Sequence, residues 1–162
     1  MVATTSLDIR ELILGTGPFG PAEVRAIMDA LGSDRTVLRE LKDAVRELED
    51  QPERSPASSV RLGVCQQLLG HAKQAVATLR QADGGALALF HHGLALASQG
   101  LHDEAAAILD SARKAGYEAA TCVSLAAEAL RKAGKGDEAR QQLASLPEAE
   151  AEQSASYWAE KA

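Results

Sequence analysis

The chain repeats one spacing of small and apolar residues three times. In the middle copy, two glycines seven residues apart are followed by Ala, Leu and Ala at further steps of five, four and three residues. The copies begin at positions 63, 93 and 127. A period of this length is typical of stacked supersecondary units rather than of one closed globule. The three copies are Gly63, Gly70, Ala75, Leu79, Ala82; Gly93, Gly100, Ala105, Leu109, Ala112; and Ala127, Gly134, Ala139, Leu143, Leu146.

The composition favours helices over strands. Hydrophobic residues make up 46% of the 162 residues, but only 3% are aromatic, so the apolar mass is mostly Ala and Leu. Ala has the highest helix propensity, and its small side chain lets helices approach closely. Strand-forming residues never alternate over a useful length. We therefore expect an all-α fold.

The charge balance and the cysteine count limit the partners and the compartment. The chain has 17 Lys and Arg against 23 Asp and Glu, a net charge of -6, and no basic face suited to a nucleic acid. It has no apolar run long enough to span a membrane, and its start does not resemble a signal peptide. Cys65 and Cys122 are too few for a disulfide framework and are expected to be reduced and packed. We expect a cytoplasmic protein.

Residues 1–50 precede the repeats and are expected to form three helices. Gly32 is expected to end the second helix, and Ser33 or Asp34 to cap the third. The segment 51–58, QPERSPAS, is predicted to be a linker. From their apolar stripes, the helices are expected near 7–14, near 21–31 and from the cap to about 49.

Each repeat divides into two helices joined by a turn, and these residues resemble the tetratricopeptide repeat (TPR), a 34-residue helix–turn–helix. In the middle repeat, helices near 87–98 and 103–115 flank the turn, with Asp103 as the expected cap of the second helix. The resemblance places Gly93 where the two helices cross and Ala105 opposite it. The turn sequence GLHDEA is similar to the family's GDYDEA, and GKGDEA in the next repeat is a second copy.

The resemblance implies a TPR-like solenoid of about three repeats over residues 59–162, with the small helical N-terminal segment before it. The first repeat is four residues short, and residues 1–50 either cap the array or form a divergent repeat. The repeats are expected near 56–85, 86–119 and 120–153, with a partial helix over 154–162.

The C-terminal sequence is similar to the opening of another repeat. Tyr157 lies one full repeat length beyond Val123, and the run Ser-Tyr-Trp-Ala around it resembles the start of a first helix. Two interpretations are open. The chain is either the N-terminal part of a longer repeat protein, or it ends in a capping helix.

The segment 15–20, GTGPFG, formally matches the dinucleotide-binding pattern and the glycine-rich loop of protein kinases. A dinucleotide site requires a strand before the glycines, whereas the residues before Gly15 have helical periodicity. At the position where a kinase loop has Val, this sequence has Ala22, and no other kinase motif is present. We interpret the segment as a turn between helices.

No other residues form a convincing chemical site. His91 and His92 are adjacent, so on a helix they point about 100° apart and do not converge on a metal as residues four apart would. The two cysteines have no evident histidine base. The acidic residues Glu148, Glu150 and Glu152 are interpreted as a solvated connector. We therefore expect no catalytic, metal or cofactor site.

The resemblance implies that the first helix of each repeat lines a concave groove that receives a peptide or helix. The matching positions carry apolar residues in the first two repeats and polar residues in the third, without the Lys and Asn of a carboxylate clamp. Such a strip suits an apolar or amphipathic segment of another protein. The groove residues are Val60, Val64, Gln67 and Leu68; Leu87, Phe90, Leu94 and Ala97; and Thr121, Ser124, Glu128 and Arg131.

Three uses of this groove are open: partner binding, cover by the N-terminal helices, and self-association. The preferred prediction is a non-catalytic scaffold for protein–protein interaction. The alternatives are a self-assembling repeat module and the regulatory arm of a larger enzyme that lies beyond residue 162.

Overall fold

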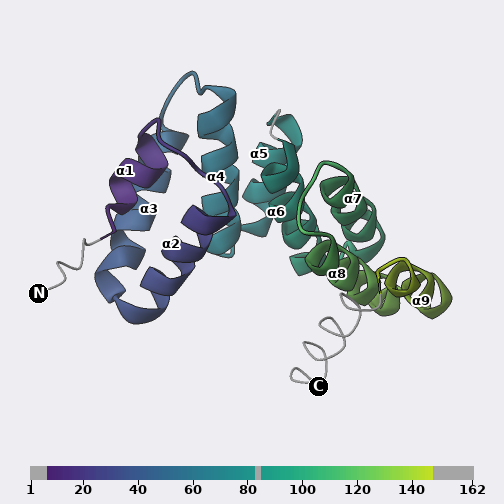
Figure 1. Ribbon diagram of the computed structural model, residues 1–162. Helices are drawn as coiled ribbons and strands as arrows, with labels where there is room; N and C mark the ends of the chain where they lie inside the picture. The colour runs from purple at the N-terminus through teal and green to yellow at the C-terminus, as the bar shows by residue number, and fades with distance from the viewer. Residues whose placement is uncertain (1–6, 83–84, 148–162) are drawn as a thin grey trace, which may run out of the picture. The chain divides into compact units, whose positions relative to one another are not determined.

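The computed structural model describes residues 7–82 and 85–147, and it confirms the all-α prediction for them (Figure 1). These residues contain no strand. The chain forms two compact units, Met1–Ala82 and Asp83–Ala162. The helices are α1 (Ile9–Leu14), α2 (Pro21–Ser33), α3 (Arg35–Glu49), α4 (Pro56–Leu68) and α5 (Ala72–Gln81) in the first unit, and α6 (Gly85–Ser98), α7 (His102–Lys114), α8 (Ala119–Lys132) and α9 (Gly136–Ala144) in the second.

The first three helices begin close to where the sequence predicts, because capping residues fix their starts. The Asp8 carboxylate accepts a hydrogen bond from the backbone amide of Glu11 at the start of α1. The Asp34 carboxylate accepts one from the backbone amide of Thr36 at the start of α3. Of the two residues expected to cap α3, Ser33 and Asp34, the structure therefore shows Asp34 as the cap. The expected end of α2 at Gly32 is wrong by one residue, since the helix continues through Ser33.

The core of the first unit joins α1, α2 and α3 to α4. Leu62 and Cys65 of α4 are buried in it, and Leu68 packs against it. The unit boundary after Ala82 therefore places the first expected repeat with the N-terminal helices. The other buried members of this core are Ile9, Ile13, Ile27, Val37, Leu41, Ala44, Val45 and Leu48.

The linker predicted over 51–58 ends earlier than expected. Ser55 caps α4 by accepting the amide of Ser58, and Pro56 occupies the first helical position. Proline suits that position because the amide it lacks has no partner within the helix there. The last three residues of the expected linker are thus helical.

In the second unit, which the structure describes over residues 85–147, each helix packs against the helix that follows it in the chain (Figure 1). Helix α7 lies between α6 and α8, so it is shared by two neighbouring pairs. The expected cap at Asp103 is wrong. Helix α7 begins one residue earlier, at His102, after Leu101, and Asp103 lies in its first turn.

Gly63 and Gly93, which begin the first two copies of the repeated spacing, lie where two helices cross. A Cβ atom on Gly93 would lie 2.7 Å from Cγ of Leu109 and 3.5 Å from the Ala105 carbonyl oxygen. A Cβ atom on Gly63 would clash in the same way with Leu79, which follows it at the same separation along the chain. The expected crossing of Gly93 and Ala105 is therefore confirmed.

The second position of the repeated spacing is glycine in all three copies, and it ends the first helix of each pair with the same hydrogen bonds. In the middle copy, the amide of Gly100 donates to the Ala97 carbonyl and the amide of Leu101 to the Leu96 carbonyl, which is a Schellman motif. The motif needs a left-handed residue, and glycine adopts that conformation without steric cost. The three glycines are Gly70 (φ +80°), Gly100 (φ +77°) and Gly134 (φ +81°).

Some predictions lie outside the described residues. These are the partial helix over 154–162, with Tyr157, and the acidic connector at Glu148, Glu150 and Glu152. Within the residues that are described, none of the helices is long and apolar enough to cross a membrane.

Candidate interaction surface

In α6, the predicted groove residue Phe90 is buried, with 8% of its surface exposed. Its ring stacks on that of Tyr117, with centroids 4.0 Å apart and an angle of 8° between the planes. The ring also meets His91 edge-on at 5.4 Å. Leu87 and Leu94 on the same helix are only partly buried, so part of each side chain remains exposed to solvent.

Helix α8 carries the four polar groove residues. Ser124 is 5% exposed, and its hydroxyl donates to the Ala120 carbonyl oxygen at 2.7 Å. Glu128 is part-buried and pairs with Lys132 at 3.0 Å. Thr121 is part-buried and Arg131 is exposed. Thr121, Glu128 and Arg131 are therefore at least partly exposed to solvent, whereas Ser124 is buried and bonded to the backbone of its own helix.

The structure brings the predicted residues Ser124, Glu128 and Arg131 together at a hollow of about 230 Å³ between α8 and α9. Among the residues that line it, Ala127 and Ala139 are buried, whereas Arg131 and Arg140 are exposed. We call this hollow the α8–α9 seat. Its remaining lining residues are Gly136 and Leu143.

The predicted groove residues of α4 belong to the first unit. Val64 is fully buried at 0% exposure, and Val60 is partly buried. Leu68 packs against the core that α4 shares with α1, α2 and α3. Cover of the groove by the N-terminal helices stays a prediction from the sequence.

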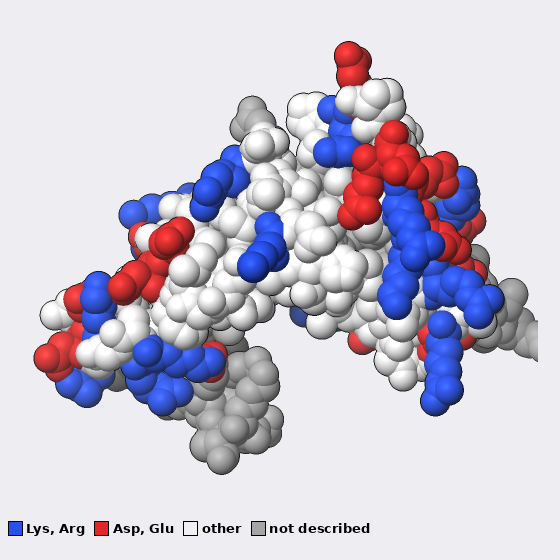
Figure 2. Space-filling view, turned by 180° about the vertical axis from the view of Figure 1, so that it is seen from behind, with Lys and Arg blue, Asp and Glu red and all other residues white. Residues whose placement is uncertain are grey.

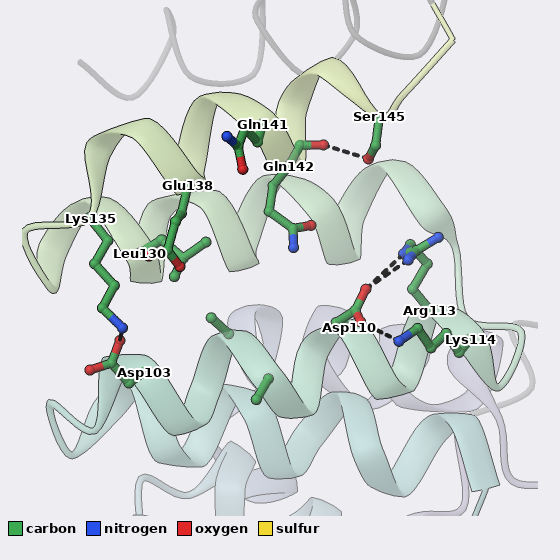
Figure 3. Close-up of a pocket in the computed structure, with 12 residues that line it drawn as sticks. Asp103, Asp110, Arg113, Lys114, Leu130, Lys135, Glu138, Gln141, Gln142 and Ser145 are labelled. Carbon is green, nitrogen blue, oxygen red and sulfur yellow. Dashed lines mark hydrogen bonds and ion pairs between the residues drawn. The ribbon is translucent and has the colours of Figure 1, made fainter.

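A second hollow, of about 520 Å³, lies between α7 and α9, and sequence reasoning did not identify it (Figure 3). Asp103 and Lys135 pair at 2.9 Å at one end of it. At the other end, Asp110 pairs with Arg113 at 2.7 Å and with Lys114 at 2.8 Å. The spacing of the Asp110 group was visible in the sequence, but the first pair joins residues from two separate repeats and depends on helix packing.

These pairs shift the acid–base properties of their members. Hydrogen bonds from Lys114 and then Arg113 lower the pKa of the Asp110 carboxyl below its usual value. The hydrogen bond to Asp103 raises the pKa of Lys135. Figure 2 shows acidic and basic side chains interspersed on the face in view, without a broad patch of one sign. The α7–α9 hollow is thus a charge-balanced surface whose cations already have anionic partners.

The GTGPFG segment is the turn between α1 and α2, as the sequence predicts. Its carbonyl oxygens at Gly15 and Gly17 accept hydrogen bonds from the guanidinium of Arg61, which is 6% exposed. The guanidinium also lies 5.5 Å from the centroid of the Phe19 ring. A buried cation on α4 therefore fixes this turn through its carbonyl groups. No sequence pattern indicated this role of Arg61.

The histidines and cysteines singled out in the sequence are buried. His91 and His92 are 3% and 7% exposed, and burial lowers the pKa of His91 to about 4. Burial raises the pKa of the Cys65 thiol to about 12 and that of Cys122 to about 11. Both cysteines are free thiols, as expected, and they stay protonated at neutral pH. Over 7–82 and 85–147, no group of three or more His, Cys, Asp or Glu side chains is placed to hold a metal ion.

Comparisons with known proteins give no identification. Searches against protein-family models, curated proteins and solved structures find no match to this chain.

Proposed function

We propose that the chain is a TPR-type scaffold for protein–protein interaction. One observation carries the proposal: the same Schellman turn recurs at Gly70, Gly100 and Gly134, once in each repeat. In the first two copies, a Gly–Leu helix crossing also recurs at the same spacing. Repeats of this length work by presenting a surface formed by stacked helix pairs.

In this proposal, the binding surface of the second unit combines Leu87 and Leu94 on α6 with Thr121, Glu128 and Arg131 on α8. These residues retain exposed surface, unlike Phe90 and Ser124. The apolar pair would hold the apolar face of a partner helix, and the charged pair would set its orientation. Because the helices are already ordered, binding would cost little conformational entropy in the scaffold.

The proposed role is non-catalytic and cytoplasmic, and the proposed partner is a protein rather than a nucleic acid. At neutral pH, His91 is neutral and the thiols of Cys65 and Cys122 are protonated. These protonation states support a non-catalytic role, because a buried, protonated thiol is not an activated nucleophile. The acidic net charge of -6 opposes binding to phosphate backbones.

The test compares two Leu→Asp variants as baits for partners from a lysate, with quantitative mass spectrometry. Leu94→Asp places a charge on the proposed surface, and Leu101→Asp places the same charge on a side chain that is 41% exposed in the α6–α7 turn. We expect proteins bound by the wild type to be lost from Leu94→Asp and retained by Leu101→Asp. Equal retention by both variants would contradict the proposed surface, provided that far-UV circular dichroism shows both to be folded.

Self-assembly and a regulatory role in a larger enzyme remain predictions from the sequence. Light scattering over a range of concentrations tests the first, since a strict monomer excludes it.

A further inference from the structure

Helix α3 of the first unit carries four cations along one line of its surface. They follow one another at steps of four, three and four residues, which places them on the same face of the helix. All four residues are exposed. We call this line the α3 basic stripe, and its residues are Arg35, Arg39, Lys42 and Arg46.

The cations of the stripe have few anionic partners. Within the part of the chain that the structure describes, Arg35, Arg39 and Lys42 form no ion pair. Arg46 lies 3.9 Å from Asp43, which is a long separation for an ion pair, and both side chains are mostly exposed. The stripe is therefore a line of positive charge that remains largely unpaired.

The stability of α3 does not explain the stripe, because these charges oppose the helix. Arg35 is the first residue of α3, where the positive end of the helix dipole disfavours a cation. Each member of the stripe also has a like charge three or four residues away, and such pairs destabilise a helix. An anionic partner would relieve both effects.

The two sides of the stripe indicate the shape of that partner. On one side, the carboxylates of Glu40 and Asp43 line a hollow together with residues of α1. These carboxylates, and the net charge of -6, would repel a broad polyanion such as an anionic membrane or a nucleic acid. A single line of acidic side chains, as on one face of a helix, can meet the cations without approaching these carboxylates.

The other side of the stripe is apolar. Leu38 is 42% exposed, and it lies three residues after Arg35 and four before Lys42, so it borders both cations. An apolar side chain next to the acidic line of a partner helix would cover it. We propose that the α3 basic stripe binds an acidic amphipathic helix of another protein, with its carboxylates along the cations and an apolar residue on Leu38.

The size of the stripe fits this mode of binding. At 1.5 Å per residue it extends for about 16 Å, which corresponds to about three turns of a partner helix. Charge pairs along this length would set the register and orientation of the helix. The proposal rests on the first unit, and it holds whether or not the proposed surface of the second unit binds a partner.

Nuclear magnetic resonance of the isotope-labelled full chain tests the proposal, because it detects weak binding and locates it. The probe is a synthetic helical peptide with Glu at the spacing of the stripe and Leu beside this line. The control peptide has Gln in place of each Glu. At low salt we expect only the acidic peptide to shift the amide signals of residues 35–46, and added salt should weaken its binding.

Two double variants with the same change of charge locate the site. Arg39→Glu with Lys42→Glu should weaken the affinity for the acidic peptide at least about tenfold, because an exposed ion pair contributes up to about fivefold and the new carboxylates repel the peptide. Lys73→Glu with Arg80→Glu alters two exposed residues of α5 and should bind as the wild type does. If the first variant is unfolded by far-UV circular dichroism, Arg39→Gln with Lys42→Gln replaces it.

Absence of signal shifts in α3 of the wild type would overturn the proposal. Equal affinities of the two double variants, or equal shifts with the acidic and the control peptide, would also overturn it. Vesicles of phosphatidylserine provide the last arm. If the vesicles bind the wild type through Arg39 and Lys42 while the peptide does not bind, the stripe recognises a membrane surface rather than a helix.

Discussion

Gly93 of α6 lies so close to Leu109 of α7 that the two helices can cross only because Gly93 has no side chain. A Cβ atom there would lie 2.7 Å from Cγ of Leu109. Gly63 and Leu79 repeat this relationship in the α4–α5 pair. Interhelical packing therefore requires glycine at positions 63 and 93, whereas the left-handed backbone conformation favours glycine at positions 70 and 100.

Replacing Gly93 by Ala should destabilise the protein although it improves helix propensity. The Cβ atom would displace Leu109, and overpacking of this kind costs about 1–3 kcal/mol. Urea unfolding followed by circular dichroism measures the change. The matched control is Gly32→Ala in α2, where a Cβ meets nothing within 4 Å, and we expect it to stabilise by about 0.5–1 kcal/mol. Equal effects of the two substitutions would contradict the packing argument.

Gly100→Ala should destabilise the protein for a different reason. Gly100 has φ +77° and open space around its Cα, so the cost is conformational and amounts to about 1–2 kcal/mol. Gly100→Asn should cost less, because asparagine tolerates the left-handed region better. Gly136→Ala, near the next turn, is the control: its nearest atom is 4.0 Å away and its backbone is not left-handed. The prediction fails if Gly100→Ala unfolds at the wild-type urea concentration.

Arg61→Met should loosen the turn between α1 and α2. It removes the donors to the Gly15 and Gly17 carbonyls, and hydrogen bonds to a charged group contribute about 1.5–3 kcal/mol. Arg61→Lys should recover little, because one ammonium cannot reproduce the guanidinium fork. Hydrogen exchange of the amides in 15–20 should accelerate in both variants. Arg25→Met, at an exposed position of α2, should leave exchange unchanged.

Burial of His91 should make stability depend on pH in the weakly acidic range. Its pKa is about 4 in the folded protein against 6.5 for an ordinary histidine, so the unfolded chain binds more protons between these values. This contribution is fully present above pH 6.5 and is lost as the pH falls toward 4. Between pH 7 and pH 5 the loss is about 2 kcal/mol.

Urea unfolding of wild type and His91→Gln at the two pH values measures this contribution. The variant should lose less stability than the wild type on acidification, since the other titrating groups are common to both. An equal loss in the two proteins would show that His91 does not titrate in this way.

The helical fold and the places of the turns could be predicted from the sequence because they depend on local chemistry. Gly70, Gly100 and Gly134 lie in turns between helices, as predicted, and Asp34 caps α3. These outcomes depend on a few neighbouring residues, so a repeated pattern is sufficient to reveal them. The cap expected at Asp103 failed because the left-handed glycine already ends α6, and the turn leads directly into α7 at His102.

Burial and contacts between distant residues were decided only by the tertiary structure. Phe90 was expected to face a groove, but Tyr117 lies against its ring. Arg61 had no visible role, yet it binds a turn far upstream in the chain. The pairing of Asp103 in α7 with Lys135 in the α8–α9 turn likewise requires the packing of α8 against α7. The sequence alone determined where helices end and the chain turns, because the left-handed conformation of glycine depends on local steric limits. Only packing in three dimensions determined which side chains remain available, because exposure depends on what lies opposite.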